Sequence, residues 1–300
     1  MRFIKFLILL SCGLSTIVGC AVGPRTIDSK KNDVLLAPVD YFSVRNLPQP
    51  KSAECPANDK SWQLENIKSV IKYANACARL SNFIKLESLG NYIAQKYPNL
   101  PWGPFYLSLA AEGRKEYSRA LWMIDLAIKK SSHMAIFNYQ KGRIYWQIGE
   151  YTNAVKEYNI AIKENPNFIE PILFLAQLSY KNKDFKSAKK YFMTALQVDA
   201  DNLSATLGLA EVNETLGDSK SAVEFYAKAV NMSPRTLSYR FKLASLYENS
   251  QKDYVQALSV YKRIQTVINE SRSLAEEIPV NVKEKINHLE GLLNQKKVVK

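Results

Sequence analysis

The sequence predicts an all-α fold: a solenoid of about six helix-turn-helix units, closed at its C-terminal end by a capping helix. Two features that recur every 34 residues predict it. The first is a small residue at the eighth position of every unit, which lets two paired helices approach closely. These small residues are Ala74, Ser108, Gly142, Ala176, Ala210 and Ala244. Because one pair of helices is too small to bury its own apolar face, we expect the units to stack.

The second feature is an aromatic residue at position seventeen, followed three residues later by a small one. The aromatic residues are Phe83, Tyr117, Tyr151, Phe185 and Tyr254. Position twenty holds Leu86, Ala120, Ala154, Ala188, Ala222 and, after a one-residue insertion near Lys252, Ala257. The large side chains are expected to fill the gaps between helices that the small residues bring together.

The first element, residues 1–19, has the features of an export signal. Arg2 and Lys5 precede an apolar run from Phe6 to Val18. This run is shorter than the about 20 residues that a membrane-spanning helix needs. We expect the segment to be cleaved as a lipoprotein signal peptide, and an uncleaved anchor helix is the alternative.

The end of the signal, Ile17-Val18-Gly19-Cys20, resembles the lipobox of bacterial lipoproteins. The resemblance implies that Cys20 becomes the mature amino terminus and carries fatty acyl chains such as palmitate. Two or more such signals anchor a protein stably, whereas one chain binds a membrane only marginally. The residue after Cys20 is alanine rather than aspartate. In that family this implies the outer membrane, with the protein on its periplasmic face.

Residues 20–66 are expected to form the lipid anchor and an extended tether. They show no sustained helical pattern and contain five of the twelve prolines. Cys55 in this segment and Cys77 in the first repeat remain as one pair of cysteines. Disulfides persist in exported proteins, so a bridge is one interpretation; two buried free thiols are the other.

Residues 67–271 are expected to form the repeat array. Its units are 67–100, 101–134, 135–168, 169–202, 203–236 and 237–271. The clearest unit contains Gly142, Tyr145, Gly149, Tyr151, Ala154, Tyr158, Ala161 and Pro166. This pattern resembles the tetratricopeptide repeat, a helix-turn-helix of 34 residues. The resemblance implies a right-handed superhelix of stacked repeats that binds other proteins and is not an enzyme.

Residues 272–300 are expected to form the capping helix and a basic tail. Val282, Ile286, Leu289 and Leu293 recur at helical spacing, which predicts one apolar face. Such a face would cover the last repeat of the array.

The tetratricopeptide resemblance also implies a binding groove, lined by the first helix of each repeat at positions two, five, nine, twelve and thirteen. The residues at these positions include Phe105, Leu109, Tyr139, Arg143, Trp146, Tyr180, Lys181, Glu211, Glu214, Phe241 and Glu248. Aromatic residues and arginine are typical of interface hot spots. The groove is therefore expected to have an aromatic and basic half and an acidic half. Core packing is the alternative for Tyr139 and Trp146.

No metal site or cofactor is predicted. The two histidines, His133 and His288, are more than 150 residues apart and have no partners at metal-ligand spacing. The net charge of +13 would suggest nucleic acid in a cytoplasmic protein, but the export signal argues against such a partner. A small-molecule substrate is not expected either.

The expected function is that of an outer-membrane scaffold that binds protein partners during assembly of an envelope complex. The architecture is similar to that of pilotin-type lipoproteins, which help outer-membrane secretins assemble for type IV pili. The alternative is a glycan-binding protein of the cell wall, or an adaptor or regulator of peptidoglycan hydrolases. Glu211 and Glu214 are the only candidate acid–base pair for wall chemistry. Self-association into a homo-oligomer stays open.

Overall fold

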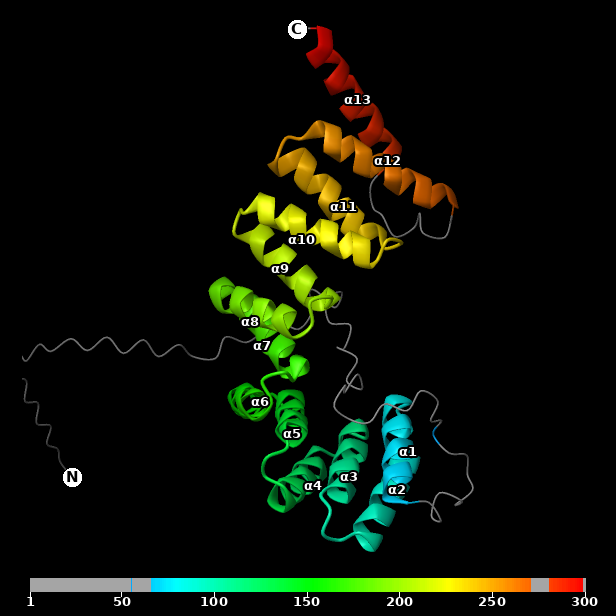
Figure 1. The fold of residues 1–300 in the computed structure, drawn as a ribbon, viewed down its shortest axis with the longest axis vertical. Coiled ribbons are helices and arrows are strands. Elements are labelled where there is room, and N and C mark those ends of the chain that lie inside the picture. Colours follow the sequence, from blue (N-terminus) through cyan, green and yellow to red (C-terminus); the bar gives the residue numbers. More distant parts are fainter. Residues whose placement is uncertain (1–54, 56–65, 271–280, 299–300) are drawn as a thin grey trace, which may run out of the picture. The chain divides into compact units, whose positions relative to one another are not determined.

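The computed structural model describes Cys55, residues 66–270 and residues 281–298, with side chains up to residue 295 (Figure 1). The predicted signal peptide, Cys20 and most of the predicted tether lie outside these residues. Every regular element in the described residues is a helix. The prediction of an all-α helix-turn-helix array is therefore confirmed.

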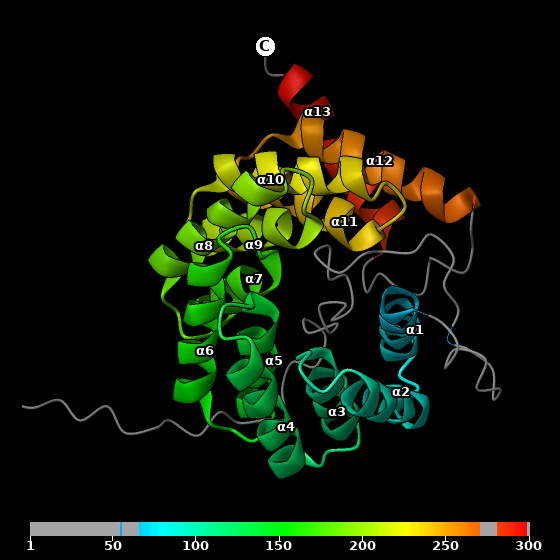
Figure 2. The same cartoon turned by 60° about the horizontal axis from the view of Figure 1, so that its bottom comes forward.

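The helices fall into six pairs and one final helix. The first helices of the pairs, called A helices below, are α1 (Ile67–Arg79), α3 (Trp102–Gly113), α5 (Ala135–Gln147), α7 (Ile169–Lys181), α9 (Leu203–Thr215) and α11 (Leu237–Ser245). The second, or B, helices are α2 (Phe83–Lys96), α4 (Tyr117–Lys130), α6 (Tyr151–Glu164), α8 (Phe185–Val198), α10 (Ser219–Met232) and α12 (Tyr254–Glu270). The final helix is α13 (Val282–Val298). Successive helices pack against one another (Figure 2).

The contact between paired helices depends on small residues. Ala176, Ala210 and Ala244 at position eight are fully buried, as are Ala154 and Ala188 at position twenty. Large residues at position twenty-four pack against them. Because these gaps are small, added volume there is expected to force the helices apart.

Gly208 in α9 is the tightest of these contacts between helices that we describe. A Cβ atom at Gly208 would lie 2.2 Å from the Phe192 ring of α8. In contrast, a Cβ atom at Gly291 in α13 would meet no atom within 4 Å. Glycine at position 208 therefore permits the close approach of two helices.

The turn between the A and B helices has the same backbone geometry in each described unit. The residue at position fifteen has a positive φ, between 54° and 83°, in all six. These residues are Ser81, Lys115, Gly149, Lys183, Gly217 and Lys252. Only two of the six are glycine, so the turn imposes this left-handed conformation even on lysine, at a cost of about 1 kcal/mol.

The one-residue insertion of the last unit is accommodated as a π-helix, η2 (Leu246–Ser250), that directly follows α11. The Gln251 amide donates a hydrogen bond of 3.0 Å to the carbonyl of Leu246, five residues earlier. A π turn holds one residue more than an α turn. The turn at Lys252 and the start of α12 thus keep the geometry of the other units.

Helix α13 covers the end of the array, as expected of a capping helix. Its buried residues Val282 and Leu289 pack into one cluster with Ala257, Tyr261 and Ile264. Within the described residues, no helix combines the length and apolar content needed to cross a membrane.

Cys55 and Cys77 form a disulfide in the structure, with Cα atoms 4.6 Å apart. Cys77 is fully buried in α1, among residues of the first hydrophobic cluster. The bridge closes a loop with a sequence separation of 22 residues. In the chain-entropy model a loop of this size stabilises the fold by about 3 kcal/mol.

Candidate partner-binding surface

Several residues expected in the aromatic half of the groove are core residues instead. Phe105, Leu109 and Tyr139 are only 2%, 8% and 3% exposed. The Phe105 ring lies 5.2 Å from the Phe137 ring of the next A helix, between centroids. The prediction that these three residues line an open surface is wrong. Large apolar side chains at positions five and nine gain more by filling the space between helices than by facing water.

Trp146 is also packed between helices, although it is only half-buried. Its ring centroid lies 4.5 Å from that of Tyr151 and 4.7 Å from that of Phe174. Tyr139 contacts Tyr158 and Phe168 in the same way. These aromatic residues therefore join repeats to one another, and the predicted contiguous strip does not form.

Arg143 takes part in a polar cluster that sequence analysis did not identify. Its guanidinium lies 2.9 Å from the carboxylate of Glu112 on the preceding A helix. Gln140 donates a 2.8 Å hydrogen bond to the other oxygen of Glu112 and accepts one of 3.1 Å from Arg143. Glu112 and Gln140 are 8% and 1% exposed. Arg143 therefore fixes α5 against α3 and is not free to bind a partner.

Tyr180 and Lys181 stand at the end of α7. The Tyr180 hydroxyl lies 3.3 Å from that of Thr215 on α9, and its ring is 5.6 Å from the ring of Phe185. Lys181 is exposed. Lys181 is thus accessible, whereas Tyr180 mainly connects two A helices.

Glu214 belongs to a pairing that occurs twice. Tyr226 on α10 donates a 2.8 Å hydrogen bond to Glu214, and the Lys242 ammonium lies 3.0 Å from the same carboxylate. One repeat later, Glu248 accepts a 2.9 Å hydrogen bond from Tyr261 and pairs with Lys285 of α13 at 2.7 Å. Each carboxylate thus holds its own B helix and the following helix. A glutamate at position twelve with a tyrosine at position twenty-four is the sequence signal for this pairing.

Glu211 differs from the carboxylates around it. It lies one turn before Glu214 on α9 and is half-buried, yet no described residue forms a hydrogen bond or ion pair with its carboxylate. Burial raises the pKa of the Glu211 carboxyl; the nearby Lys242 ammonium opposes this effect and the charge of Glu214 adds to it. Burial and the Glu211 charge also raise the pKa of Tyr239 on α11. Glu211 is therefore a carboxylate under desolvation, with an aromatic neighbour and no internal partner.

The described residues contain no group of three or more His, Cys, Asp or Glu side chains that could hold a metal ion. What this part of the chain presents is a set of side chains suited to contacts rather than to a reaction.

Comparison with known families identifies the repeats. Family models described as tetratricopeptide repeat match residues 135–168, 175–235 and 239–266. The chain carries tetratricopeptide repeats. Helices α1 to α4, before the matched residues, have the same paired arrangement and the same position-fifteen turn.

Solved tetratricopeptide structures resemble this fold at low sequence identity. The C-terminal part of a TPR repeat-containing protein from Cytophaga hutchinsonii is 16% identical, with a TM-score of 0.62 over 76% of this chain and 90% of that one. The Cut9–Hcn1 hetero-tetramer of APC/C is 14% identical, with a TM-score of 0.50 over 78% of this chain and 44% of that one. YrrB, a TPR protein with an unusual peptide-binding site, is 15% identical, with a TM-score of 0.49 over 63% and 98%. No curated protein matches the chain.

A tetratricopeptide fold supports a scaffold for protein–protein interactions, and such repeats are generally not enzymes. Of the residues expected in the groove, Phe105, Leu109, Tyr139, Arg143 and Trp146 are used to join repeats. Glu211 remains as the polar group on the A helices whose own repeat array does not satisfy it. The surface around Glu211 and Tyr239 is therefore the candidate partner-binding surface.

Proposed function

We propose that this protein is a lipid-anchored scaffold of the bacterial outer membrane, whose tetratricopeptide repeats bind a protein partner on the periplasmic side. The signal-like residues 1–19 and the lipobox-like cysteine at position 20 support the anchor. The Cys55–Cys77 disulfide supports an oxidising compartment, because disulfides are rare in cytosolic proteins. The partner belongs to an envelope complex, for which secretin assembly during pilus formation is our leading example.

The observation that carries the binding proposal is the half-buried, unpaired carboxylate of Glu211. Burying a charge without a partner costs free energy, so such groups gather at functional sites. An incoming lysine or arginine side chain would supply the missing partner, and the Tyr239 ring beside it would receive the apolar stem of that side chain. We therefore propose that a basic side chain of the partner protein binds beside Glu211.

A wall-cleaving alternative gains no support from the acidic pair. Both oxygens of Glu214 lie within hydrogen-bonding distance of Lys242, and one of them also accepts from Tyr226. This carboxylate is therefore already used in holding α9, α10 and α11 together.

The experiment that tests binding is capture of the cross-linked protein from intact cells, followed by mass spectrometry. Glu211→Gln removes the charge with little change in shape, and Glu224→Gln, an exposed glutamate on the B helix α10, is the matched control. We expect one main partner that is captured by the wild type and by Glu224→Gln and is lost with Glu211→Gln. Equal capture by all three proteins would place the partner elsewhere.

The location is tested separately. Cys20→Ala is expected to abolish labelling by a fatty-acid probe and to release the protein from the outer-membrane fraction. A Cys20→Ala protein that is still labelled and still sediments with that membrane would contradict the anchor without bearing on Glu211.

A further inference from the structure

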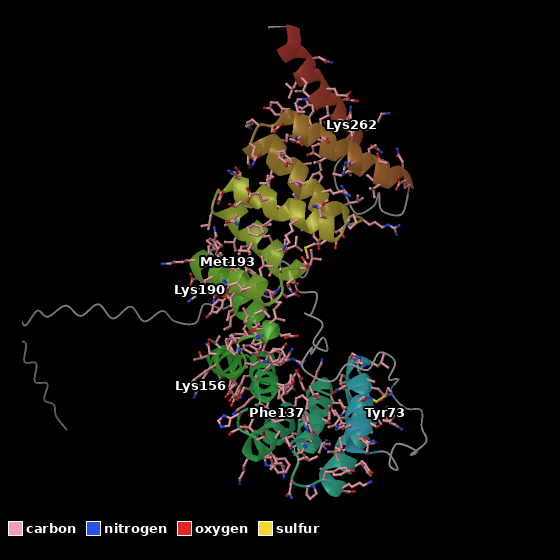
Figure 3. All side chains as sticks on the ribbon, in the orientation of Figure 1. Tyr73, Phe137, Lys156, Lys190, Met193 and Lys262 are labelled. Carbon is pink, nitrogen blue, oxygen red and sulfur yellow. A yellow bond between two sulfur atoms is a disulfide. The ribbon has the colours of Figure 1, made fainter. Side chains whose placement is uncertain are left out.

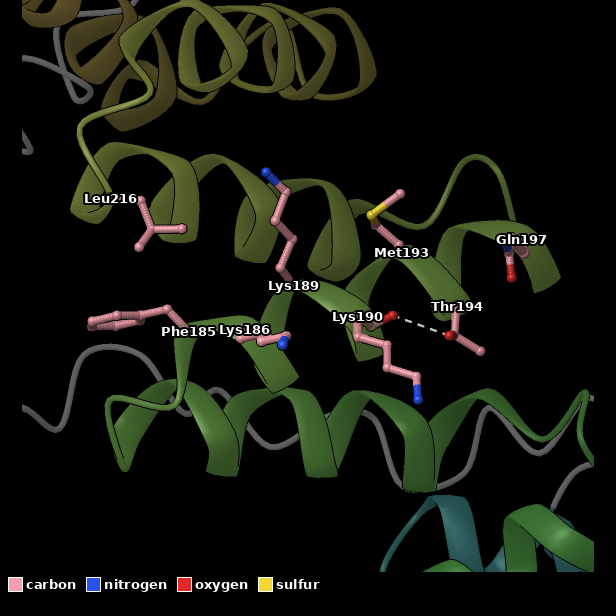
Figure 4. Close-up of a pocket in the computed structure, with 8 residues that line it drawn as sticks. All are labelled: Phe185, Lys186, Lys189, Lys190, Met193, Thr194, Gln197 and Leu216. Carbon is pink, nitrogen blue, oxygen red and sulfur yellow. Dashed lines mark hydrogen bonds between the residues drawn. The ribbon is translucent and has the colours of Figure 1, made fainter.

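A second surface, distinct from the one around Glu211, lies on the outside of the B helix α8. Here a groove of about 640 Å³ runs along α8 to the turn that follows α9 (Figure 4). It is lined by Phe185, Lys186, Lys189, Lys190, Met193, Thr194, Gln197 and Leu216. All but Leu216 lie on α8, so one helix supplies nearly the whole lining.

The groove exposes apolar side chains to water. Met193 is 50% exposed and Leu216 is 53% exposed, although both are large hydrophobic residues. The half-buried Phe185 ring is held against Tyr180 of α7 at 5.6 Å. Apolar groups gathered within one groove and rimmed by polar residues are typical of interaction sites.

The charges in the groove are all positive. Lys189 donates a 2.7 Å hydrogen bond to Asn213, whereas Lys186 and Lys190 form no hydrogen bond or ion pair through their ammonium groups with any described residue. The nearest aspartates cap helices: Asp184 accepts from the Ser187 amide and Asp218 from the Ser221 amide. Their charges are therefore partly engaged at helix N-termini.

The equivalent surface one repeat earlier lacks these properties. Residues 34 positions before Met193, Lys190 and Leu216 are Asn159, Lys156 and Asn182. Both apolar side chains are replaced there by asparagine, and only one lysine is kept. Lys156 and Lys190 are both exposed on B helices and are labelled in Figure 3. The apolar and basic groove is thus a property of this repeat rather than of the repeat pattern.

We infer that this groove binds an acidic amphipathic segment of a protein partner. The carboxylates of the segment would pair with Lys186 and Lys190, and its apolar side chains would rest on Met193 and Leu216. A row of positive charges favours an acidic occupant by charge complementarity, and the apolar floor favours a chain that offers hydrophobic side chains between its acids. The partner at Glu211 is instead recognised by a basic group, so the two surfaces select opposite charges.

The test uses a fluorescent peptide in which pairs of glutamates flank leucine and phenylalanine, titrated with the purified protein. The double variant Lys186→Glu/Lys190→Glu is expected to weaken binding about tenfold or more, and Met193→Ser is expected to weaken it as well. Lys156→Glu, the matched control, is expected to change the affinity less than twofold. These side chains are exposed, so the melting temperature of each variant is expected to stay near that of the wild type.

Four results would overturn the inference. The wild type does not bind the peptide, or the double variant binds it as tightly as the wild type does. A peptide with serine in place of its leucine and phenylalanine binds with undiminished affinity, which would mean that only charge matters. Vesicles rich in phosphatidylglycerol bind through Lys186 and Lys190 while the peptide does not, which would assign the groove to anionic lipid.

Discussion

The hydroxyl of Tyr226 donates a 2.8 Å hydrogen bond to the carboxylate of Glu214, twelve positions earlier in the same repeat. Through this bond α10 is held to α9, and the Lys242 ammonium extends the contact to α11. The same arrangement around Glu248 holds the capping helix α13. A polar contact thus runs through the last repeats alongside the apolar core.

Tyr226→Phe is expected to lower the free energy of unfolding by about 1–2 kcal/mol. The substitution leaves a partly buried charged acceptor with one donor fewer, and the loss of a hydrogen bond to a charged group costs this much. Urea unfolding followed by circular dichroism measures it. The control is Tyr145→Phe, since no described residue accepts a hydrogen bond from that hydroxyl; its expected effect is below about 0.5 kcal/mol. Equal effects of the two substitutions would contradict the role given to the Tyr226–Glu214 bond.

Arg143→Ala is expected to destabilise the fold by about 3 kcal/mol, because it leaves the carboxylate of Glu112 buried without its ion pair. Lys181→Ala, a basic residue exposed at the end of the next A helix, is expected to have almost no effect. Thermal melting distinguishes the two. If Arg143→Ala leaves stability unchanged and abolishes partner capture, Arg143 is a binding residue after all.

Gly208→Ala is expected to destabilise the protein by about 1–3 kcal/mol, since the new methyl group would overlap the Phe192 ring. Gly291→Ala has open space around it within α13 and is expected to raise stability by up to about 1 kcal/mol through helix propensity. The two substitutions are chemically identical, so their difference reports packing alone. A stabilising Gly208→Ala would show that α8 and α9 are not packed this closely.

Glu211→Gln is expected to raise stability at neutral pH, and the gain is expected to depend on pH. The pKa of this carboxyl is raised in the folded state, so the cost of burying its charge is absent below the unfolded-state pKa of about 4.3. This cost appears as the pH rises through the folded-state pKa. The advantage of the glutamine variant should therefore grow between pH 4 and pH 7. A constant difference over this range would contradict the desolvated state of Glu211.

The fold could be predicted from the sequence because its contacts repeat. Ala154 and Ala188 occupy the same place in successive helix pairs, so one spatial requirement recurs at a fixed spacing along the chain. The π-helix at Leu246–Ser250 could not be predicted in this way. An insertion can be absorbed in a turn or in a helix, and only tertiary packing decides between them.

The site was less predictable, because position in a repeat does not fix the partners of a side chain. Tyr139 occupies a position that lines the groove in the family, but its large ring inserts between helices. Glu211 and Glu214 both belong to the acidic half, and their sequence positions do not tell them apart. What separates them is the reach of Tyr226 and Lys242, which satisfy Glu214 and leave Glu211 without a partner.

The central proposal is that a protein partner binds beside Glu211, and photo-cross-linking in living cells tests it most directly. A photoreactive benzoylphenylalanine is introduced at Tyr239, next to Glu211, or at Lys156 on the outside of α6 as the control. We expect one cross-linked product at position 239 that disappears when Glu211→Gln is added, and none at position 156. A product at position 239 that persists with Glu211→Gln, or one that forms only at position 156, would contradict the proposal.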